Sequence, residues 1–145
     1  MSSAMQNAES ICAQRHLQFT RVRRRVLEIL LSEHKALGAY DILSYLNFEG
    51  LGSQPPVAYR ALEFLVLNGF VHKVEKLNAF IACSYSGKKH LPAFMICRLC
   101  KAVAESRTTP SANSLGDAAR EAGFQIENTV VEAEGICRAC QGLSK

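Results

Sequence analysis

The stretch PPVAYRALEFLVLNGFVHKVEKLNAFIAC, residues 55–83, changes its periodicity halfway along and thereby indicates the fold. Its first half places apolar residues at helical spacing, namely Ala58, Ala61, Leu62 and Leu65. The paired prolines suit the first turn of that helix, and Gly69 suits its end. In the second half, two apolar runs at 70–74 and 79–83 flank the turn-like EKLN, which is typical of a β-hairpin. The stretch therefore predicts a helix that leads directly into a hairpin.

The residues before this stretch are predominantly helical in pattern. We predict an amphipathic helix over 8–19, a second helix from Arg21 to His34 with Thr20 as its N-cap, and a third over 39–47. Gly and Pro in 48–56 indicate a loop before the fourth helix. Three or four helices followed by a hairpin are the layout of a winged-helix DNA-binding domain, which we predict for residues 1–83.

The residues after this stretch have a different character. Ser, Gly and Pro in 84–92 indicate a hinge. Beyond it, we expect strands around 93–100 and 101–105, a helix around 111–123, and a strand around 124–137. The predicted fold class is α+β, with an N-terminal winged-helix domain, a hinge over 84–92, and a C-terminal α/β domain over 93–145.

Composition limits the function without deciding it. The chain has 145 residues, of which 48% are hydrophobic, and a net charge of +4. No stretch approaches the roughly 20 apolar residues of a membrane-spanning helix, and the first residues lack the layout of a secretory signal, so we expect a cytoplasmic protein without a membrane partner. The modest positive charge permits binding to nucleic acid, but any such signal must come from where the charges lie.

Two C-x-x-C runs, CRLC at 97–100 and CRAC at 137–140, carry the strongest chemical signal. In a reduced compartment, paired runs of this kind read as soft metal ligands, and four thiolates suit tetrahedral zinc. The gap between them, residues 101–136, holds 36 residues, so the site would join the two ends of an α/β unit. Four thiolates leave no open position for a substrate water, which predicts structural zinc. Buried free thiols and a redox dithiol pair are the alternatives.

A second set of metal-ligand residues surrounds the predicted hinge: His72, Cys83, His90 and Glu105. Taken singly, each has an ordinary interpretation, such as a phosphate contact, a small buried residue or a solvated side chain. Together they supply two imidazoles, a thiolate and a carboxylate, a donor set that suits tetrahedral zinc. They come from both predicted domains and from the hinge, so a metal held there would clamp the domains together. We expect this site to release zinc more readily than the four-thiolate site.

Basic residues gather at the start of the second predicted helix, where Arg21, Arg23, Arg24 and Arg25 lie together. Such a cluster can meet phosphate, although charge runs are also common on solvated helix faces. Tyr59 and Arg60 lie near the start of the fourth helix, where a recognition helix carries its base-reading residues. Arginine can bind guanine through two hydrogen bonds, and a tyrosine ring can pack on a thymine methyl group. A half-buried packing role is the alternative for Tyr59.

The residues that carry a family resemblance are PPVAYRALEFLVLNGFVHKVE, then Cys83 and His90, then FMICRLCKAVAE, and finally GICRAC. In these residues the chain resembles the ferric-uptake-regulator family, specifically its zinc-uptake-regulator branch. The resemblance runs from about Ser10 to Cys140. It implies that the C-terminal α/β domain over 93–145 is a dimerisation domain. It implies a homodimeric repressor of zinc-uptake genes, not an enzyme, that binds an AT-rich palindromic DNA operator and no small organic substrate. It implies two zinc ions per chain, one structural and one regulatory. By position, it carries over Cys97, Cys100, Cys137 and Cys140 as structural ligands, His72, Cys83, His90 and Glu105 as regulatory ligands, and Arg23, Tyr40, Tyr59 and Arg60 as DNA contacts.

Several positions depart from the family pattern. Val57 stands where relatives usually have Thr, and TRVRR at 20–24 replaces the usual Thr-Pro-Gln-Arg. Ser44 and Asn47 stand where some zinc regulators carry an acid and a base that bridge neighbouring dimers on DNA. An iron, manganese or peroxide sensor of the same family remains an alternative, although the Cys83 thiolate favours zinc. A redox-switched C-x-x-C protein and a zinc-stapled interaction module without a DNA role are the alternatives from other classes.

Overall fold

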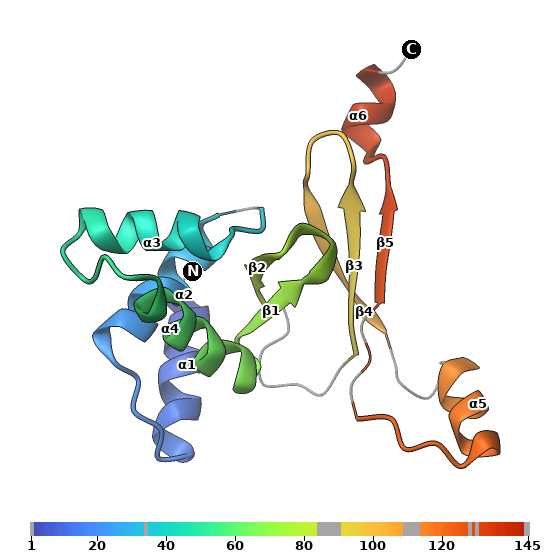
Figure 1. The fold of residues 1–145 in the computed structure, drawn as a ribbon, viewed down its shortest axis with the longest axis horizontal. Helices are drawn as coiled ribbons and strands as arrows, with labels where there is room; N and C mark the ends of the chain where they lie inside the picture. The colour runs from blue at the N-terminus through green and yellow to red at the C-terminus, as the bar shows by residue number, and fades with distance from the viewer. Residues whose placement is uncertain are drawn as a thin grey trace. The chain divides into compact units, whose positions relative to one another are not determined.

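The chain forms two units, Met1–Gly87 and Lys88–Lys145, which we call the helical unit and the sheet unit. The computed structural model describes residues 2–33, 35–83, 91–108, 114–127, 129 and 131–143 (Figure 1). Residues 84–90 of the predicted hinge lie outside this range, and its last two residues, Leu91 and Pro92, begin strand β3. The assignment of a DNA-binding role to one unit and a dimerisation role to the other stays a prediction at this point.

Four helices build the described part of the helical unit: α1 (Ser2–Gln14), α2 (Arg21–Ser32), α3 (Ala39–Phe48) and α4 (Pro55–Leu67). Helix α4 packs against both α2 and α3. The apolar residues that the sequence places at helical spacing meet in one core, whose most buried side chains include Val26, Leu30, Ile42, Leu46, Leu62 and Leu65. The exposed face of α4 is therefore fixed by the two helices, α2 and α3, that bury its other face.

Helix α1 differs from the prediction of a helix over 8–19. It begins at Ser2 and ends at Gln14, and its buried face is made by Met5, Ala8 and Cys12. His16 then takes a left-handed conformation with φ of 58°. The Leu17 N–H donates to Cys12 O at 2.8 Å and the His16 N–H donates to Ala13 O at 3.3 Å, which closes the helix end as a Schellman motif. The predicted helix was wrong at its start because alanine and methionine give a weak periodic signal, and wrong at its end because the left-handed His16 stops the helix before Leu17.

The ends of α2 and α4 follow from local chemistry that the sequence shows. Thr20 caps α2, as predicted, with its Oγ1 accepting from Arg23 N at 3.3 Å. Pro55 begins α4, where a missing N–H leaves no helical hydrogen bond unmade. After α4, Gly69 has a φ of 80°, and the Phe70 N–H donates to Leu65 O at 2.9 Å. This turn directs the chain from α4 straight into the first strand.

The predicted hairpin is present, as β1 (Val71–Val74) and β2 (Ala79–Ala82) in antiparallel pairing. A 3-10 turn, η1 (Glu75–Leu77), and a left-handed Asn78 connect the strands. Leu37 adds a bridge to the hairpin edge, donating to Phe80 O at 2.9 Å and accepting from Phe80 N at 2.7 Å. Four helices followed by this hairpin give the helical unit the order of a winged helix (Figure 1).

Among its described residues, the sheet unit has three strands in the order β4 (Val103–Thr108), β3 (Leu91–Cys97) and β5 (Val131–Gly135). Strands β3 and β4 are antiparallel, whereas β3 and β5 are parallel, and helix α5 (Ser114–Ala122) lies between β4 and β5 in the chain. Of the predicted strand over 124–137, the described residues form a strand only in β5, and a short final helix, α6 (Arg138–Leu143), was not predicted. The parallel pairing brings the ends of β3 and β5 side by side.

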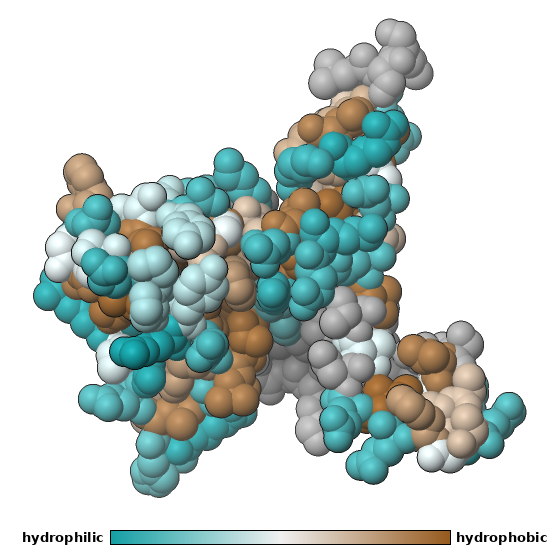
Figure 2. All heavy atoms as spheres, viewed as in Figure 1, coloured by the Kyte–Doolittle hydropathy of each residue, from teal (hydrophilic) through white to brown (hydrophobic). Residues whose placement is uncertain are grey.

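Apolar side chains are also exposed on this unit. On the face drawn in Figure 2, hydrophobic residues gather around α5 and the segment after it. Leu115 is 54% exposed and Phe124 is 69% exposed, so neither side chain is part of the buried core. Among the described helices, none combines the length and the apolar character needed to cross a bilayer.

Candidate metal centre and nucleic-acid interface

The four cysteines of the two C-x-x-C runs come together at one end of the three-stranded sheet. Cys97 ends β3 and is paired with Gly135, the last residue of the parallel strand β5. The Arg98 N–H donates to Gly135 O at 2.8 Å, which extends this pairing into the turn. Cys137 follows two residues later, and Cys140 lies in α6. One ligand atom from each of the four cysteines lies within 4.8 Å of the others.

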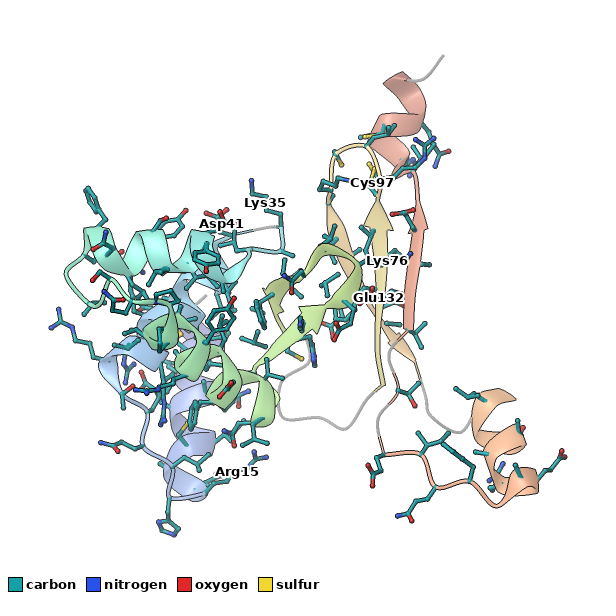
Figure 3. All side chains as sticks on the ribbon, viewed as in Figure 1. Arg15, Lys35, Asp41, Lys76, Cys97 and Glu132 are labelled. Atoms are coloured by element: carbon teal, nitrogen blue, oxygen red, sulfur yellow. The ribbon has the colours of Figure 1, made fainter. Side chains whose placement is uncertain are left out.

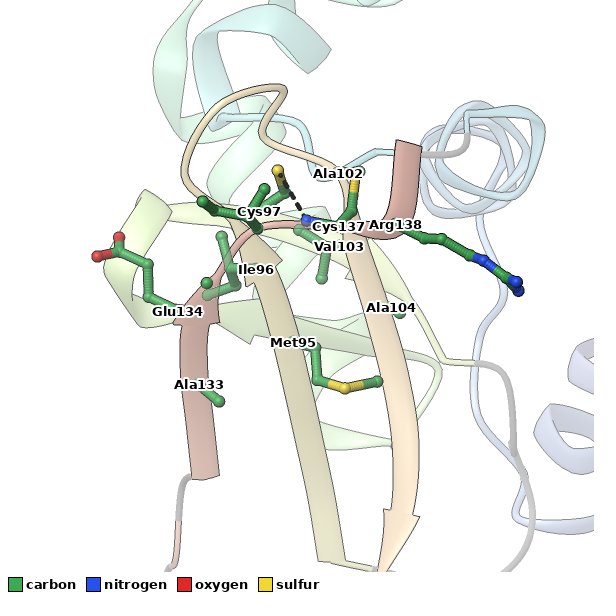
Figure 4. Close-up of a pocket in the computed structure, with 12 residues that line it drawn as sticks. Met95, Ile96, Cys97, Ala102, Val103, Ala104, Ala133, Glu134, Cys137 and Arg138 are labelled. Atoms are coloured by element: carbon green, nitrogen blue, oxygen red, sulfur yellow. Dashed lines mark hydrogen bonds between the residues drawn. The ribbon is translucent and has the colours of Figure 1, made fainter. Parts of the chain in front are cut away.

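The turn at the first run has the geometry of a metal-binding knuckle. The Cys97 N–H donates to Ala102 O at 2.9 Å, and the Lys101 N–H donates to Cys97 O at 2.9 Å. Lys101 has a φ of 65°, a left-handed conformation that this tight turn requires. The Sγ of Cys97 accepts from Cys100 N at 3.5 Å and from Cys137 N at 3.4 Å, the second of which is drawn in Figure 4. One backbone N–H group from each run, that of Cys100 and that of Cys137, therefore donates to the same sulfur atom, Cys97 Sγ.

These contacts give the thiols of the cluster different acidities. The backbone N–H of Cys100, followed by that of Cys137, lowers the pKa of the Cys97 thiol to about 6. The pKa of the Cys140 thiol is raised to about 12, first by its hydrogen bond to the Cys137 side chain and then by burial. The Cys97 thiol, labelled in Figure 3, therefore ionises more readily than the Cys140 thiol, and a divalent cation that binds the cluster would release the proton that Cys140 retains.

The donor set and its spacing fit zinc. Cys100 Sγ and Cys137 Sγ lie 3.8 Å apart. A zinc ion with four sulfur ligands at about 2.3 Å would have sulfur–sulfur edges of about 3.8 Å, so this pair already matches one edge of the tetrahedron. The two sulfur atoms belong to different C-x-x-C runs, so the tertiary fold, and not the turn within one run, sets the distance between them.

Two residues of the second predicted ligand set lie together in the helical unit. His72 is on β1, opposite Ile81, and Cys83 directly follows β2. The Cys83 N–H donates to Phe70 O at 2.9 Å, so its side chain is held at the base of the hairpin, where it is 7% exposed. A ring nitrogen of His72 and the Sγ of Cys83 lie within 4.8 Å of each other. Glu105 is on β4 of the sheet unit, opposite Phe94, and His90 lies outside the described residues.

The residues predicted to read DNA lie on exposed helix positions. Tyr59 and Arg60 are on the face of α4 away from the core, and Tyr59 is 42% exposed. Tyr40, at the start of α3, is 67% exposed. Within the described part of the chain, the side chains of these three residues make no hydrogen bond or ion pair. They are therefore available to an external partner.

The arginine cluster on α2 is mostly engaged within the helical unit. The Arg23 guanidinium lies over the Phe64 ring of α4 at 3.9 Å and donates to Gln18 O at 2.5 Å. Arg24 forms an ion pair with Glu9 of α1. Arg25 donates to both carboxylate oxygens of Glu49, at 2.6 and 2.8 Å. Sequence reasoning missed the partners Phe64, Glu9 and Glu49 because they lie 15 or more residues from their arginines, beyond any helical i, i+4 pattern.

Comparison with known proteins identifies the family. The zinc uptake regulation protein of Escherichia coli (strain K12) is 39% identical over 134 residues, which cover 92% of this chain and 78% of that protein. The chain belongs to the zinc uptake regulators. A zinc uptake regulator solved in complex with zinc and DNA has a TM-score of 0.93 and 36% identity, and covers 99% of this chain and 96% of its own.

Other comparisons agree with this assignment to the zinc uptake regulators. Holo XcZur, in a crystal structure, has a TM-score of 0.87 and 34% identity over 98% of this chain and 99% of its own. No family model matches the chain. The predicted α+β fold class and the predicted resemblance to the zinc-uptake-regulator branch are confirmed by these relatives.

Proposed function

We propose that this chain is a zinc-responsive transcriptional regulator that, as a zinc-loaded homodimer, binds an AT-rich palindromic operator and represses zinc-uptake genes. One observation carries the proposal: the chain is 39% identical to a zinc uptake regulation protein, and its own four cysteines lie close enough together to bind one zinc ion. The chain is accordingly a regulator and not an enzyme, and its place of action is the cytoplasm.

The structural zinc ion is assigned to Cys97, Cys100, Cys137 and Cys140. Their mutual distances and the N–H groups directed at Cys97 Sγ support this assignment. Bound zinc supplies a charge that holds four thiolates at one point. The protein's own part is to deliver two sulfur pairs from the paired ends of β3 and β5, so the ion would lock the parallel edge of the sheet.

The regulatory zinc ion is assigned to His72, Cys83, His90 and Glu105, which makes two zinc ions per chain. The closeness of His72 and Cys83 at the base of the hairpin supports this set. A thiolate among the donors favours zinc over iron or manganese, which prefer more oxygen ligands. The other two donors come from the predicted hinge and the sheet unit, so binding would restrict how the wing can move. Coupling of this kind is typically worth about 1–3 kcal/mol.

The DNA-binding role is assigned to Arg23, Tyr40, Tyr59 and Arg60. Helix α4 would enter the major groove, where Arg60 can bind guanine and Tyr59 can pack on a thymine methyl group. Arg23 keeps guanidinium N–H groups for a phosphate while its stacking on Phe64 fixes it to α4. The exposed Tyr40 lies at the first turn of α3, where helix N–H groups also favour phosphate.

The homodimer is assigned to the sheet unit. Its exposed apolar side chains include Met95, Leu115 and Phe124. A cavity of about 500 Å³ with mainly apolar lining, including Met95 and Val103, lies next to the cysteine cluster (Figure 4). Apolar surface of this kind usually marks an interface, and a palindromic operator requires a twofold protein.

The regulatory assignment is tested by zinc titration of Cys83→Ser. The parent should bind two zinc ions per chain and gain affinity for an AT-rich palindromic duplex as free zinc rises. Cys83→Ser should keep one zinc ion and lose most of this gain. Cys12→Ala is the matched control, since Cys12 is a buried thiol of the same unit outside the ligand set. The assignment fails if Cys83→Ser still responds to zinc as the parent does.

A further inference from the structure

Helix α4 carries an acidic side chain on the face that would meet DNA. Tyr59, Arg60 and Glu63 are all exposed, whereas Ala58, Ala61, Leu62 and Leu65 are buried. Glu63 lies three and four residues after Arg60 and Tyr59, so the three side chains form one strip along the helix. A carboxylate at this place needs an explanation, because the phosphates of a DNA groove would repel it.

The charge of Glu63 is not neutralised within the helical unit. Its side chain makes no hydrogen bond or ion pair among the described residues. Lys73 lines the same cavity of about 430 Å³ as Glu63 and Tyr59, between α4 and the hairpin. The Lys73 Nζ lies 3.8 Å from Glu75 Oε2, so Lys73 is paired with a residue of the wing turn. Glu63 differs in this from Glu9 and Glu49, each of which holds an arginine of α2.

We propose that Glu63 is a specificity-determining residue that accepts a hydrogen bond from the exocyclic amine of a cytosine in the major groove. In the major groove, a carboxylate can accept a hydrogen bond from the N4 amine of cytosine. Such a bond would offset the free-energy cost of removing water from the Glu63 carboxylate when the helix enters the groove. Three helical residues correspond to a rise of about 4.5 Å, somewhat more than one base-pair step of about 3.4 Å. Glu63 therefore reads a base pair one or two steps from the one that Arg60 contacts.

This inference rests on the proposed DNA-binding function and adds to it a residue that disfavours binding to the wrong DNA sequences. Tyr59 and Arg60 attract DNA of many sequences, because a phosphate is as good a partner for arginine as a base is. Glu63 would reject any site that places a carbonyl or a phosphate opposite it, since two acceptors then face each other. The strip thus combines an attractive and a repulsive group one helical turn apart.

The test compares base preferences of the parent, Glu63→Gln and Glu63→Ala. Each zinc-loaded protein selects from a random-sequence duplex library, and affinities are then measured on the parent's selected palindrome with single base-pair changes. The parent should discriminate about 10-fold or more at one C·G pair in each half-site, as expected for a direct base contact. Glu63→Ala should lose that discrimination while keeping the others, and Glu63→Gln should shift the preference at that pair towards adenine.

The matched control is Glu121→Gln, an exposed carboxylate on α5 whose loss changes the net charge equally. It should keep the parent's base preferences. The inference is overturned if Glu63→Ala strengthens binding to all sequences alike, as a merely repulsive charge would, or leaves every preference unchanged. If the zinc-loaded parent selects no sequence, the proposed function itself fails, and the inference fails with it. Zinc-dependent selection without a Glu63 effect overturns the inference alone.

Discussion

At the scale of single residues, the backbone conformation of a few positions limits which side chains they can carry. Four helices of the described chain end in the same hydrogen-bond pattern, in which the residue after the helix is left-handed. Three of them use glycine there, Gly50, Gly69 and Gly123, with φ between 67° and 80°. Helix α1 instead uses His16, at a φ of 58°. A Cβ atom makes this conformation costly.

Replacing His16 with glycine should therefore stabilise the protein. The left-handed strain is removed, while the greater freedom of glycine in the unfolded chain cancels part of the gain, so the expected increase is about 0.5–1 kcal/mol. Urea unfolding followed by circular dichroism measures it. Gly69→Ala is the opposite control and should destabilise the protein. An unchanged or lower stability for His16→Gly would show that the histidine makes a compensating contact.

A second residue-scale constraint couples Gly52 to Val57, the position where relatives usually have Thr. Gly52 has a φ of 151°, and a Cβ placed on it would lie 2.8 Å from Val57 Cγ1. Gly52→Ala should cost about 1–3 kcal/mol through both strain and this clash. Adding Val57→Ala removes both Cγ atoms but keeps the Cβ, which would lie 3.2 Å away, so it should recover most of the part due to the clash and leave the backbone part. Chemical denaturation of the two variants separates the terms, and full recovery would exclude backbone strain.

At the scale of elements, ion pairs tie the helices of the helical unit together. Arg25 of α2 binds Glu49 at the end of α3 with two hydrogen bonds, a geometry that gives more stability than a single contact. The hydrogen bond from Arg25 is the main cause that lowers the pKa of Glu49 below its ordinary value of 4.5. A lowered carboxyl pKa in the folded state means that the folded protein favours the ionised form.

The pair should make stability depend on pH. Its contribution is fully present above the ordinary carboxyl pKa and is lost as pH falls through the lowered pKa of the folded state. Glu49→Gln should therefore be less stable than the parent near neutral pH, and the difference should vanish in acid. Unfolding by urea between pH 7 and pH 3 measures this, and added salt should reduce the neutral-pH difference. A difference that persists in acid would assign the effect to packing instead.

The elements also show what the sequence could predict. Thr20, Pro55 and Gly69 mark ends of α2 and α4 because capping and turn chemistry act within a few residues. Helix α6 could not be predicted, since six residues that include the small residues Ala139 and Gly142 are too few to carry a periodic signal. The two cysteine pairs of the C-x-x-C runs could be predicted from their spacing alone. The arginine partners Glu9, Glu49 and Phe64 could not, because these contacts depend on how helices distant in the sequence pack together.

At the scale of the whole molecule, the two proposed zinc sites have different chemistry and should control different properties. The four-thiolate site receives backbone N–H groups at Cys97 Sγ and holds the ends of β3 and β5. The regulatory set has a single thiolate and two imidazoles, which must be neutral to bind metal, so protons compete with zinc there as pH falls. Loss of one zinc ion should therefore affect DNA binding, and loss of the other the sheet unit and the dimer.

Stepwise removal of zinc should separate these two effects. As chelator strength rises, the first zinc ion should leave with most of the DNA affinity while the protein stays dimeric, and the second should leave together with the dimer. Native mass spectrometry counts zinc ions and chains, and fluorescence anisotropy with an operator duplex follows DNA binding in the same samples. Cys83→Ser should begin at one zinc ion and show only the second step, since its regulatory set is incomplete. Release of both zinc ions in one step would contradict this expectation, and so would dissociation of the dimer when the first zinc ion leaves. Either result would mean that the two sites are coupled and that the structural and regulatory roles are not separate.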